Sequence, residues 1–433
     1  ALEALGSLAA GLLFTFWLVR AMTPLAVVAL AGALALLAAS GLAPRALPRV
    51  ALGLLAFAWT AAAACPAARA PLERAALEAR WRSLGALAPG GGRLLASADS
   101  PYQNLALIET EGQYALYADG RILGVFPDPV EAEHRIHFIM AQNPGAQRVL
   151  LLGGNPVNDL PELLRYPLRE LVYVEADEAV GRLLAAAAPE AYRRALTDPR
   201  LTRVHTDGPR YVKRAAGGFD AILIEAPEPA TIGLNRFYTR EFYRDVRALL
   251  APSGFVCTAV AASEHLQAES AVLSASVRTV LGAEFDRVWV TAGPVNRFFA
   301  GAAESAVTLD PETLRRRSEG AGLETRYFRP EYMLGAEALD PVKCRETARR
   351  LAAIPVEINT VTKPVSTLYQ AAVWSRLSGS GLEPVLKRLA RLPAGWVAAA
   401  LLAAGAAGLG AGVRARVSRR GRDAASPAAG RCA

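Results

Sequence analysis

The sequence predicts an α/β fold in which a mostly parallel β-sheet lies between helices, with a small antiparallel β unit before it and transmembrane helices on its flanks. Short apolar runs alternate with helical patterns over residues 129–310, which is typical of a parallel sheet. Glu-Gly and Asp-Gly dipeptides separate short strands over residues 100–128, which is typical of antiparallel hairpins. Long stretches near both ends of the chain carry no charged residue.

The uncharged stretches are residues 4–19, 21–44, 50–68 and 392–413. A membrane-spanning helix needs about 20 apolar residues, and the last three stretches reach that length. We therefore expect transmembrane helices within residues 1–68 and a further one at 392–413, although buried core helices would show a similar pattern. Because the chain starts at Ala1 rather than Met, we expect a fragment or processed product with a truncated membrane bundle.

The formal net charge of +8 reflects arginines beside these stretches, above all in the basic tail, residues 414–433. Basic flanks indicate contact with anionic lipid, so a lipid bilayer is an expected partner. Nucleic acid is not an expected partner, because no nucleic-acid-binding motif accompanies the basic residues. The chain has 4 Cys and 4 His without CxxC spacing or a His cluster, so we expect neither a metal site nor a disulfide framework.

Between the membrane segments, residues 69–99 are expected to form an amphipathic connector that ends in a Gly-rich stretch. Residues 100–128 are expected to form the antiparallel unit. Its strands are predicted at Asn104–Glu109, Tyr114–Tyr117 and Ile122–Phe126.

Residues 129–310 are expected to form the main α/β domain, and residues 311–391 a helical C-terminal extension. The expected parallel strands are Arg148–Leu152, Glu170–Val174, Leu201–His205, Ala221–Ile224 and Gly254–Val260. The expected helices are 129–142, 159–165, 177–195, 209–215 and 240–250. Phe285–Thr291 and Arg297–Ala300 are expected to close the sheet as an antiparallel pair.

Ligands of open α/β sheets bind beyond the carboxyl ends of the parallel strands, so the residues there are candidate site residues. The first strand is followed by Gly153 and Gly154, which would let the backbone approach a nucleotide or nucleoside. A tight turn without a ligand would look the same. The second strand is followed by Glu175, which can accept hydrogen bonds from both ribose hydroxyls, while Asp177 suits a helix N-cap.

The third strand is followed by Asp207 and Gly208, which can present a carboxylate and a backbone N–H to an adenine edge, or form a plain turn. The fourth is followed by Glu225 and then by Glu228, which stands between two prolines. Because proline restricts the backbone, the two carboxylates are held close to the strand end. They indicate a site for a cationic or proton-losing substrate.

With these strand ends in place, residues 100–300 resemble the polyamine aminopropyltransferase (spermidine synthase) family. The resemblance lies in Ser100–Gln103, Tyr117–Gly120, Gly153-Gly154, Glu175–Asp177, Asp207-Gly208 and Phe237–Tyr243, which follow in the family's order. The later Asn359-Thr360, Lys363-Pro364 and Trp374 resemble the membrane-attached bacterial branch.

The resemblance implies a Rossmann-like sheet of the methyltransferase type. It also implies transfer of an aminopropyl group from decarboxylated S-adenosylmethionine, a co-substrate, to a diamine such as putrescine, with no permanently bound cofactor. Glu225 would be the catalytic base, and Glu228, Gln103 and Tyr238 would bind the substrate. The donor would be held by Gly153, Gly154, Glu175, Asp207 and Gly208, with Glu175 on the ribose and Asp207 on the adenine amino group.

Two departures from the family pattern keep other functions open. Asn155 and Pro156 stand where the family's glycine loop continues, and the usual paired Asp are here Glu225 and Glu228. The alternatives are an S-adenosylmethionine-dependent methyltransferase-type enzyme and a non-catalytic membrane protein that binds a nucleoside or polyamine. We expect a multi-pass protein of the bacterial inner membrane with its soluble domain in the cytoplasm, where the substrates are, and leave open whether it is a homodimer.

Overall fold

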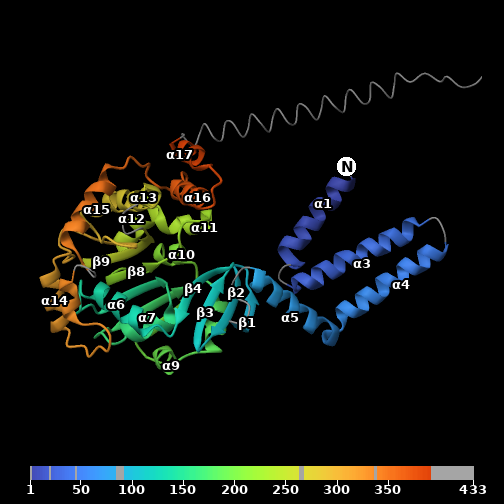
Figure 1. Cartoon of the computed structure of the whole chain (residues 1–433), viewed down its shortest axis with the longest axis horizontal. Helices are drawn as coiled ribbons and strands as arrows, with labels where there is room; N and C mark the ends of the chain where they lie inside the picture. The colour runs from blue at the N-terminus through green and yellow to red at the C-terminus, as the bar shows by residue number, and fades with distance from the viewer. Residues whose placement is uncertain are drawn as a thin grey trace, which may run out of the picture. The chain divides into compact units, whose positions relative to one another are not determined.

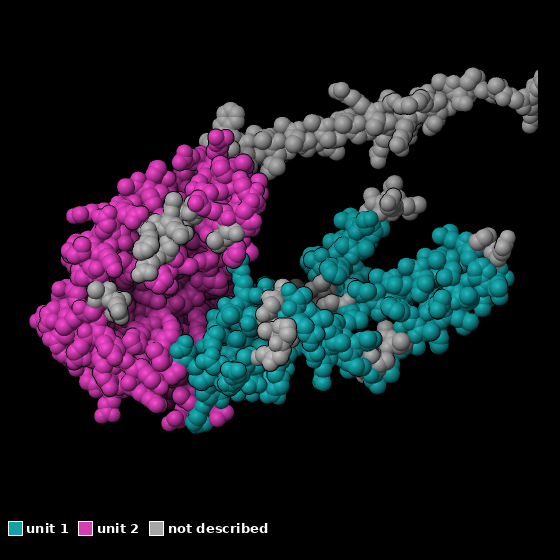
Figure 2. Space-filling model, viewed as in Figure 1, with its two compact units in different colours: residues 1–128, 177–190 teal, residues 129–176, 191–433 magenta. Residues whose placement is uncertain are grey.

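The computed structural model describes residues 2–18, 21–43, 46–83, 92–262, 268–335 and 339–391. The chain divides into two compact units, which Figure 2 shows in different colours. The first unit comprises residues 1–128 and 177–190, and the second comprises residues 129–176 and 191–433. The predicted transmembrane helix at 392–413 and the basic tail lie outside the described residues.

The first unit begins with helices. They are α1 (Leu2–Leu13), the π-helix η1 (Phe14–Leu18), α3 (Pro24–Leu42), α4 (Ala46–Ala64) and α5 (Pro66–Ser83). Helices α3 and α4 lie side by side (Figure 1), and the Trp59 indole N–H donates to the Ala29 carbonyl at 2.9 Å. Within the described residues, one helical stretch, Leu25–Leu42, is long and apolar enough to cross a membrane. Shorter apolar helices cover Gly6–Leu18 and Ala46–Ala61.

The first unit also contains an antiparallel four-stranded sheet in sequential order. Its strands are β1 (Arg93–Asp99), β2 (Asn104–Thr110), β3 (Gln113–Ala118) and β4 (Arg121–Phe126). The three predicted strands are confirmed, and both turns have positive φ at Glu111-Gly112 and Asp119-Gly120, as type I′ hairpins require. Strand β1 lies within residues 69–99, which the sequence predicts to be a connector, so this part of the prediction is wrong. The strand is half-buried along most of its length, so its sequence lacks the alternation of apolar and polar residues that marks a strand.

Two helices pack on this sheet. Trp81 of α5 is fully buried against Ala106 and Ile108 of β2. Helix α8 (Glu178–Ala185) contacts β1 and β2.

The second unit is built on a seven-stranded sheet in the order β10-β11-β9-β8-β5-β6-β7. Its strands are β5 (Arg148–Gly153), β6 (Glu170–Glu175), β7 (Leu201–His205), β8 (Phe219–Glu225), β9 (Leu250–Ala261), β10 (Arg287–Val290) and β11 (Val295–Gly301). Strands β5 to β9 are parallel, and β11 runs antiparallel between β9 and β10. This order confirms the predicted mostly parallel sheet and its closing pair.

The helices of this unit are α6 (Pro129–Met140), α7 (Pro156–Leu163), α9 (Glu190–Leu196), α10 (Gly208–Val212), α11 (Ile232–Asn235), the 3-10 helix η2 (Arg236–Tyr238), α12 (Arg240–Leu249), α13 (Ala268–Glu284), α14 (Pro311–Gly320), the 3-10 helix η3 (Pro330–Leu334), α15 (Pro341–Ala353), α16 (Val365–Leu377) and α17 (Glu383–Arg391). In Figure 1, α12 and α13 cover one face of the sheet and α6 and α7 the other. The helix predicted at 177–195 is two helices, α8 and α9, because Pro189 interrupts it.

The register of the parallel strands brings the predicted site residues to one edge. Gly153 pairs with Glu225 across β5 and β8, and Glu175 pairs with His205 across β6 and β7. The apolar residues before them, such as Leu151 and Ile224, are 0% and 1% exposed, so the sheet is a rigid core for this edge.

The C-terminal extension is hydrogen-bonded to the second unit at two buried side chains. Asn359 donates through Nδ2 to the Tyr238 carbonyl at 2.8 Å and accepts at Oδ1 from the Ser366 N–H at 3.2 Å. The Glu133 carboxylate of α6 accepts from three consecutive backbone N–H groups, those of Arg326, Tyr327 and Phe328. The extension is therefore part of the second unit rather than a separate linker.

Candidate active site

The predicted site residues fall in both units. Most of them follow β5, β6, β7 and β8 at the common edge of the second unit's sheet, whereas Gln103 belongs to the first unit. Gln103 Nε2 donates to Asp177 Oδ2 at 3.3 Å, and the Ser100 hydroxyl donates to the same oxygen at 2.6 Å. Asp177 Oδ1 accepts from the Ala179 N–H at 3.0 Å, which confirms it as the N-cap of α8.

Glu175, predicted to hold a ribose, is the last residue of β6 and is partly exposed. The Tyr173 hydroxyl donates to Glu175 Oε2 at 3.3 Å. Burial, with a smaller contribution from Glu175, raises the pKa of Tyr173 well above its usual value, so this hydroxyl stays a hydrogen-bond donor. The carboxylate is thus oriented by a neighbouring donor at the strand end.

Asp207 and Gly208 follow β7, and both have structural roles. Asp207 Oδ2 caps α10 by accepting from the Arg210 N–H at 3.1 Å, and Arg236 Nη2 contacts the same oxygen at 2.7 Å. A Cβ on Gly208 would lie 2.8 Å from Cε1 of the Phe237 ring, so glycine is required there to seat Phe237. A contact of Asp207 with an adenine amino group stays a prediction. In such a complex Arg236 would lie beside the adenine, because its Nη2 contacts Asp207 Oδ2.

The glycine turn after β5 is packed against protein groups. Gly153 and Gly154 have φ of +72° and +85°, a region that favours glycine. A Cβ on Gly154 would lie 2.8 Å from Asp159 Oδ2 and 3.2 Å from Glu225 Cβ. Helix α7 begins directly afterwards, with Asn155 as N-cap residue and Pro156 in its first turn.

Glu225 ends β8, and two arginines contact its carboxylate. Arg297 Nη1 lies 3.2 Å and Arg135 Nη1 3.5 Å from Glu225 Oε1. The Arg297, Arg135 and Glu225 side chains are only 12%, 11% and 18% exposed. Each such pair brings a Coulomb attraction of about 4 kcal/mol before the cost of desolvation, so two arginines hold the carboxylate that was predicted to be the base.

Arg135 also pairs with Asp159, whose side chain is 0% exposed. Asp159 Oδ2 accepts from the Asn155 N–H at 3.0 Å, so this acid holds the start of α7. Burial raises the pKa of Asp159 to about 6, and Arg135 opposes that rise. Asp159 therefore has a structural role, because it packs against the glycine turn after β5 and holds the start of α7.

Glu228 lies on the loop after β8, between Pro227 and Pro229. Its Oε2 accepts a hydrogen bond from Nε2 of Gln370, a residue of α16 that is 2% exposed. Tyr238, 1% exposed, donates its hydroxyl to the Ala226 carbonyl at 3.2 Å or the Pro227 carbonyl at 3.1 Å. Tyr238, predicted to line the substrate site, thus fixes the loop that carries Glu228.

Sequence reasoning missed four residues of this region. They are Arg135, Arg297, Gln370 and Arg236. Arg297 left a signal, because a charged residue interrupts the apolar strand β11. Arg135 and Gln370 left none, since a polar residue on a helix is ordinary until its neighbours are known.

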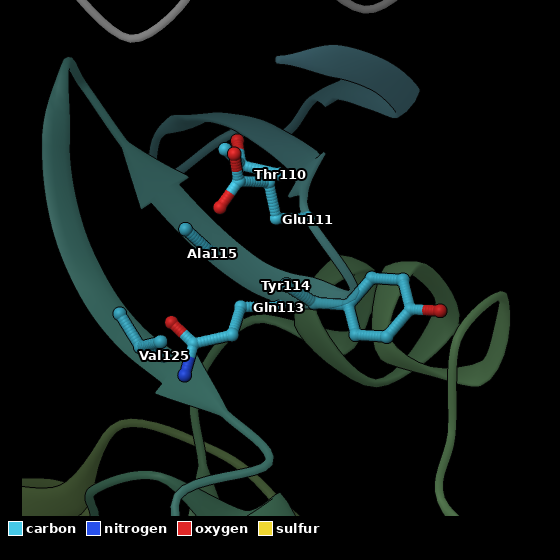
Figure 3. Close-up of a pocket in the computed structure, with 6 residues that line it drawn as sticks. All are labelled: Thr110, Glu111, Gln113, Tyr114, Ala115 and Val125. Carbon is cyan, nitrogen blue, oxygen red and sulfur yellow. The ribbon is translucent and has the colours of Figure 1, made fainter. Parts of the chain in front are cut away.

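A depression of about 430 Å³ lies elsewhere, beside the β2–β3 turn of the first unit (Figure 3). It is lined by Thr110, Glu111, Gln113, Tyr114, Ala115 and Val125. None of these is a predicted site residue, so it carries no functional argument. In the described part of the chain, no three His, Cys, Asp or Glu side chains are grouped to hold a metal ion.

Comparison with known proteins identifies the family of the chain. The model of the spermine/spermidine synthase domain matches residues 129–296. Polyamine aminopropyltransferase 1 of Hyperthermus butylicus is 30% identical over 255 residues, which cover 57% of this chain and 87% of the relative. The polyamine aminopropyltransferase of Pyrobaculum calidifontis is 28% identical over 240 residues, which cover 53% and 83%. A spermidine synthase solved with the transition-state analogue AdoDATO is 21% identical, with a TM-score of 0.49 over 60% of this chain and 89% of that chain.

The mixed Rossmann-type sheet and the matched domain define a transferase of the spermine/spermidine synthase class. The chain belongs to the polyamine aminopropyltransferase family. The resemblance stated from the sequence is thereby confirmed at the level of the family.

Proposed function

We propose that the chain transfers an aminopropyl group from decarboxylated S-adenosylmethionine to a diamine such as putrescine. The observation that carries the proposal is the convergence of Gly153, Glu175, Asp207 and Glu225 on one edge of the second unit's sheet. Ligands bind outside this edge in open α/β sheets. The relatives' names, which are those of polyamine aminopropyltransferases, support the same reaction.

In this proposal Glu175 accepts hydrogen bonds from the donor's ribose, and Asp207 accepts one from its adenine amino group. The diamine is drawn to carboxylate charge at the end of β8. Once it has lost a proton, its nitrogen attacks the carbon next to the donor's sulfonium. The carbon–sulfur bond breaks and its electrons neutralise the sulfur, so the protein's main tasks are alignment and removal of the proton.

The direct test is the mass of the product. We expect the purified chain, given decarboxylated S-adenosylmethionine and putrescine, to yield putrescine enlarged by one aminopropyl group, together with methylthioadenosine. A parallel incubation with S-adenosylmethionine serves as the control. Addition of a methyl group in that incubation alone would favour a methyltransferase. Absence of any calorimetric binding signal with either donor or with methylthioadenosine would overturn both enzymatic functions.

Glu175→Ala is expected to raise the KM for the donor about 10- to 100-fold, because hydrogen bonds to a charged group contribute about 1.5–3 kcal/mol. The matched control is Glu170→Ala at the opposite end of the same strand, where the carboxylate pairs with Arg148 at 2.9 Å. Steady-state kinetics with the donor as varied substrate gives both values. Equal KM values in the two variants would contradict the assignment of Glu175 to the ribose.

We also propose that the helices of the first unit anchor the chain in a lipid bilayer. Helix α3 has 19 residues, which at 1.5 Å per residue give about 28 Å, close to the hydrocarbon thickness of about 30 Å. Large apolar side chains of α3 and α4 are exposed, including Val28, Leu34, Leu54 and Phe57 at 65%, 59%, 64% and 74%. A surface of this composition fits acyl chains better than water.

Cys65, which is exposed between α4 and α5, offers a native probe of this anchoring. In whole cells producing the Cys432→Ser variant, an impermeant maleimide is expected to label Cys65 only after permeabilisation, because we place the soluble part in the cytoplasm. Buried Cys257 and Cys344 are expected to stay unlabelled until the protein is denatured. Labelling in intact cells would reverse the topology, and recovery of the chain in the soluble fraction would overturn the anchoring.

A further inference from the structure

We propose that helix α17 docks the second unit on the surface of a bilayer of anionic lipids and lies along that surface rather than crossing it. The α17 face, as the docking surface is called below, comprises the exposed residues Leu382, Val385, Arg388, Leu389 and Arg391. The proposal goes beyond the anchoring proposed for the helices of the first unit, and it does not depend on aminopropyl transfer.

Three large apolar side chains form a stripe along the α17 face. Leu382, Val385 and Leu389 are 56%, 53% and 40% exposed. Their spacing of three and then four residues places them on one side of a helix. Leu382 precedes the helix but is in register with it, because its carbonyl accepts from the Leu386 N–H at 3.1 Å. Single exposed leucines are ordinary on a protein surface, whereas a contiguous stripe indicates a contact surface.

The opposite side of α17 is packed on the second unit. Ala390, 1% exposed, belongs to one buried cluster with Val365 and Tyr369 of α16. Glu383, the single acid of α17, pairs with Lys387 and lies 3.8 Å from Nη1 of Arg376. The apolar stripe therefore points away from the core of the unit, and the acid of the helix is already engaged by two cations.

Basic side chains border the stripe and indicate which partner suits it. Arg388 lies one helical turn after Val385, and Arg391 lies one turn after Arg388. Both arginines are exposed, and neither pairs with an acid among the described residues. An apolar stripe beside two such cations suits a partner that offers hydrocarbon beneath a layer of negative charge. A bilayer of anionic lipids has this arrangement.

The place of α17 in the chain favours the same partner. Its 9 residues give about 14 Å at 1.5 Å per residue, which is too short to cross about 30 Å of hydrocarbon. Residues 392–413, which follow directly and lie outside the described residues, contain no charged residue and are expected to span the bilayer. A short helix binds lipid weakly by itself, but attachment to such a segment makes its contact with the surface intramolecular.

The test places a lipid-sensing probe on α17 of the full chain. Leu389→Cys, in a Cys65→Ser and Cys432→Ser background, is labelled with a nitrobenzoxadiazole fluorophore, because the two other cysteines are buried. The chain is reconstituted into vesicles of phosphatidylglycerol and phosphatidylcholine, part of which carries a nitroxide near the top of its acyl chain. We expect the nitroxide to quench this probe. Ala191→Cys is the control, because it is exposed on α9, which Figure 1 shows far from α17, and should stay unquenched.

The contribution of charge is measured with the double variant Arg388→Gln, Arg391→Gln in the same labelled chain. Removal of each arginine should lower the ratio of docked to undocked α17 about fivefold when phosphatidylglycerol is present. The matched control, Arg345→Gln with Arg349→Gln at exposed positions of α15, changes the net charge equally and should leave the quenching unaltered. Without any further substitution, raising the salt concentration from about 0.1 to about 1 M should weaken the quenching, because the Debye length falls from about 10 to about 3 Å.

Four results would overturn the docking. If the chain is recovered with the vesicles but the probe at position 389 is quenched no more than the probe at position 191, the docking fails and the proposed anchoring stands. Blue-shifted emission at position 389 without quenching would show that a second copy or another protein segment covers the stripe. Equal quenching with and without phosphatidylglycerol would show a contact that needs no anionic lipid. A chain that does not bind vesicles at all would overturn the anchoring as well, whereas the proposed transfer is tested separately by the mass of its product.

Discussion

Replacement of Arg135 by leucine is expected to lower the free energy of unfolding of the second unit by about 3–5 kcal/mol, the usual cost of removing one partner of a buried ion pair. Asp159 would be left 0% exposed without its cation, and Glu225 would keep only Arg297 of its two arginines. The midpoint of thermal unfolding should fall by on the order of 10 °C. Circular dichroism of the purified chain measures it.

Two controls identify the cause of this loss. Arg182→Leu removes an arginine from an exposed pair with Glu178 at 3.6 Å and should change the midpoint little. The double variant Arg135→Met with Asp159→Leu replaces both buried partners by apolar groups and should recover much of the lost stability. A double variant as unstable as Arg135→Leu would show that Arg135 acts mainly through Glu225.

The pH dependence of Arg135→Leu follows from the pKa of Asp159, which burial raises from 3.8 to about 6. Between these values the folded chain holds a proton that the unfolded chain has lost. This carboxyl therefore makes the free energy of unfolding fall as the pH rises through that window. Below its folded pKa of about 6, Asp159 is mostly neutral and needs Arg135 less, so the variant should lose less stability at pH 5 than at pH 8.

The sequence was sufficient to predict the backbone of the site. Residues such as Leu151 and Ile224 form short apolar runs because their strands are buried on both faces, and glycine or acid follows at each strand end. These signals lie within a few residues of each strand, so the parallel strands and the sheet edge that carries the candidate site could be predicted. Strand β1 escaped prediction because its partial burial blurs the same pattern.

The charge environment of the site could not be predicted, because it depends on contacts between distant residues. Arg297 and Glu225 are 72 positions apart, and Gln370 and Glu228 are 142 apart. The resemblance to a family supplied the roles of the two glutamates but not their partners. Those partners set the charge around each carboxylate, and only the folded structure shows them.

Glu133→Ala is expected to have the second large effect: it should lower the free energy of unfolding by about 3 kcal/mol. The variant removes the acceptor of the Arg326, Tyr327 and Phe328 N–H groups, at 3.2, 2.7 and 3.0 Å, and each unsatisfied group costs about 1–3 kcal/mol before water reaches it. Glu133→Gln keeps one acceptor oxygen and should lose less. Limited proteolysis after residue 320 should become faster in Glu133→Ala, because this carboxylate holds that segment on α6.

The same carboxylate should make the extension sensitive to acid. Burial raises the pKa of Glu133, but the three N–H groups and Arg165 outweigh burial and lower it below 4.5. A lowered pKa contributes stability that is present above the unfolded value and lost as the pH falls through the folded value. Cleavage of the wild-type segment should therefore accelerate below about pH 4.5, measured with an acid-active protease. Glu133→Gln should lack this component, and an identical acid response in both proteins would show that other carboxylates hold the extension.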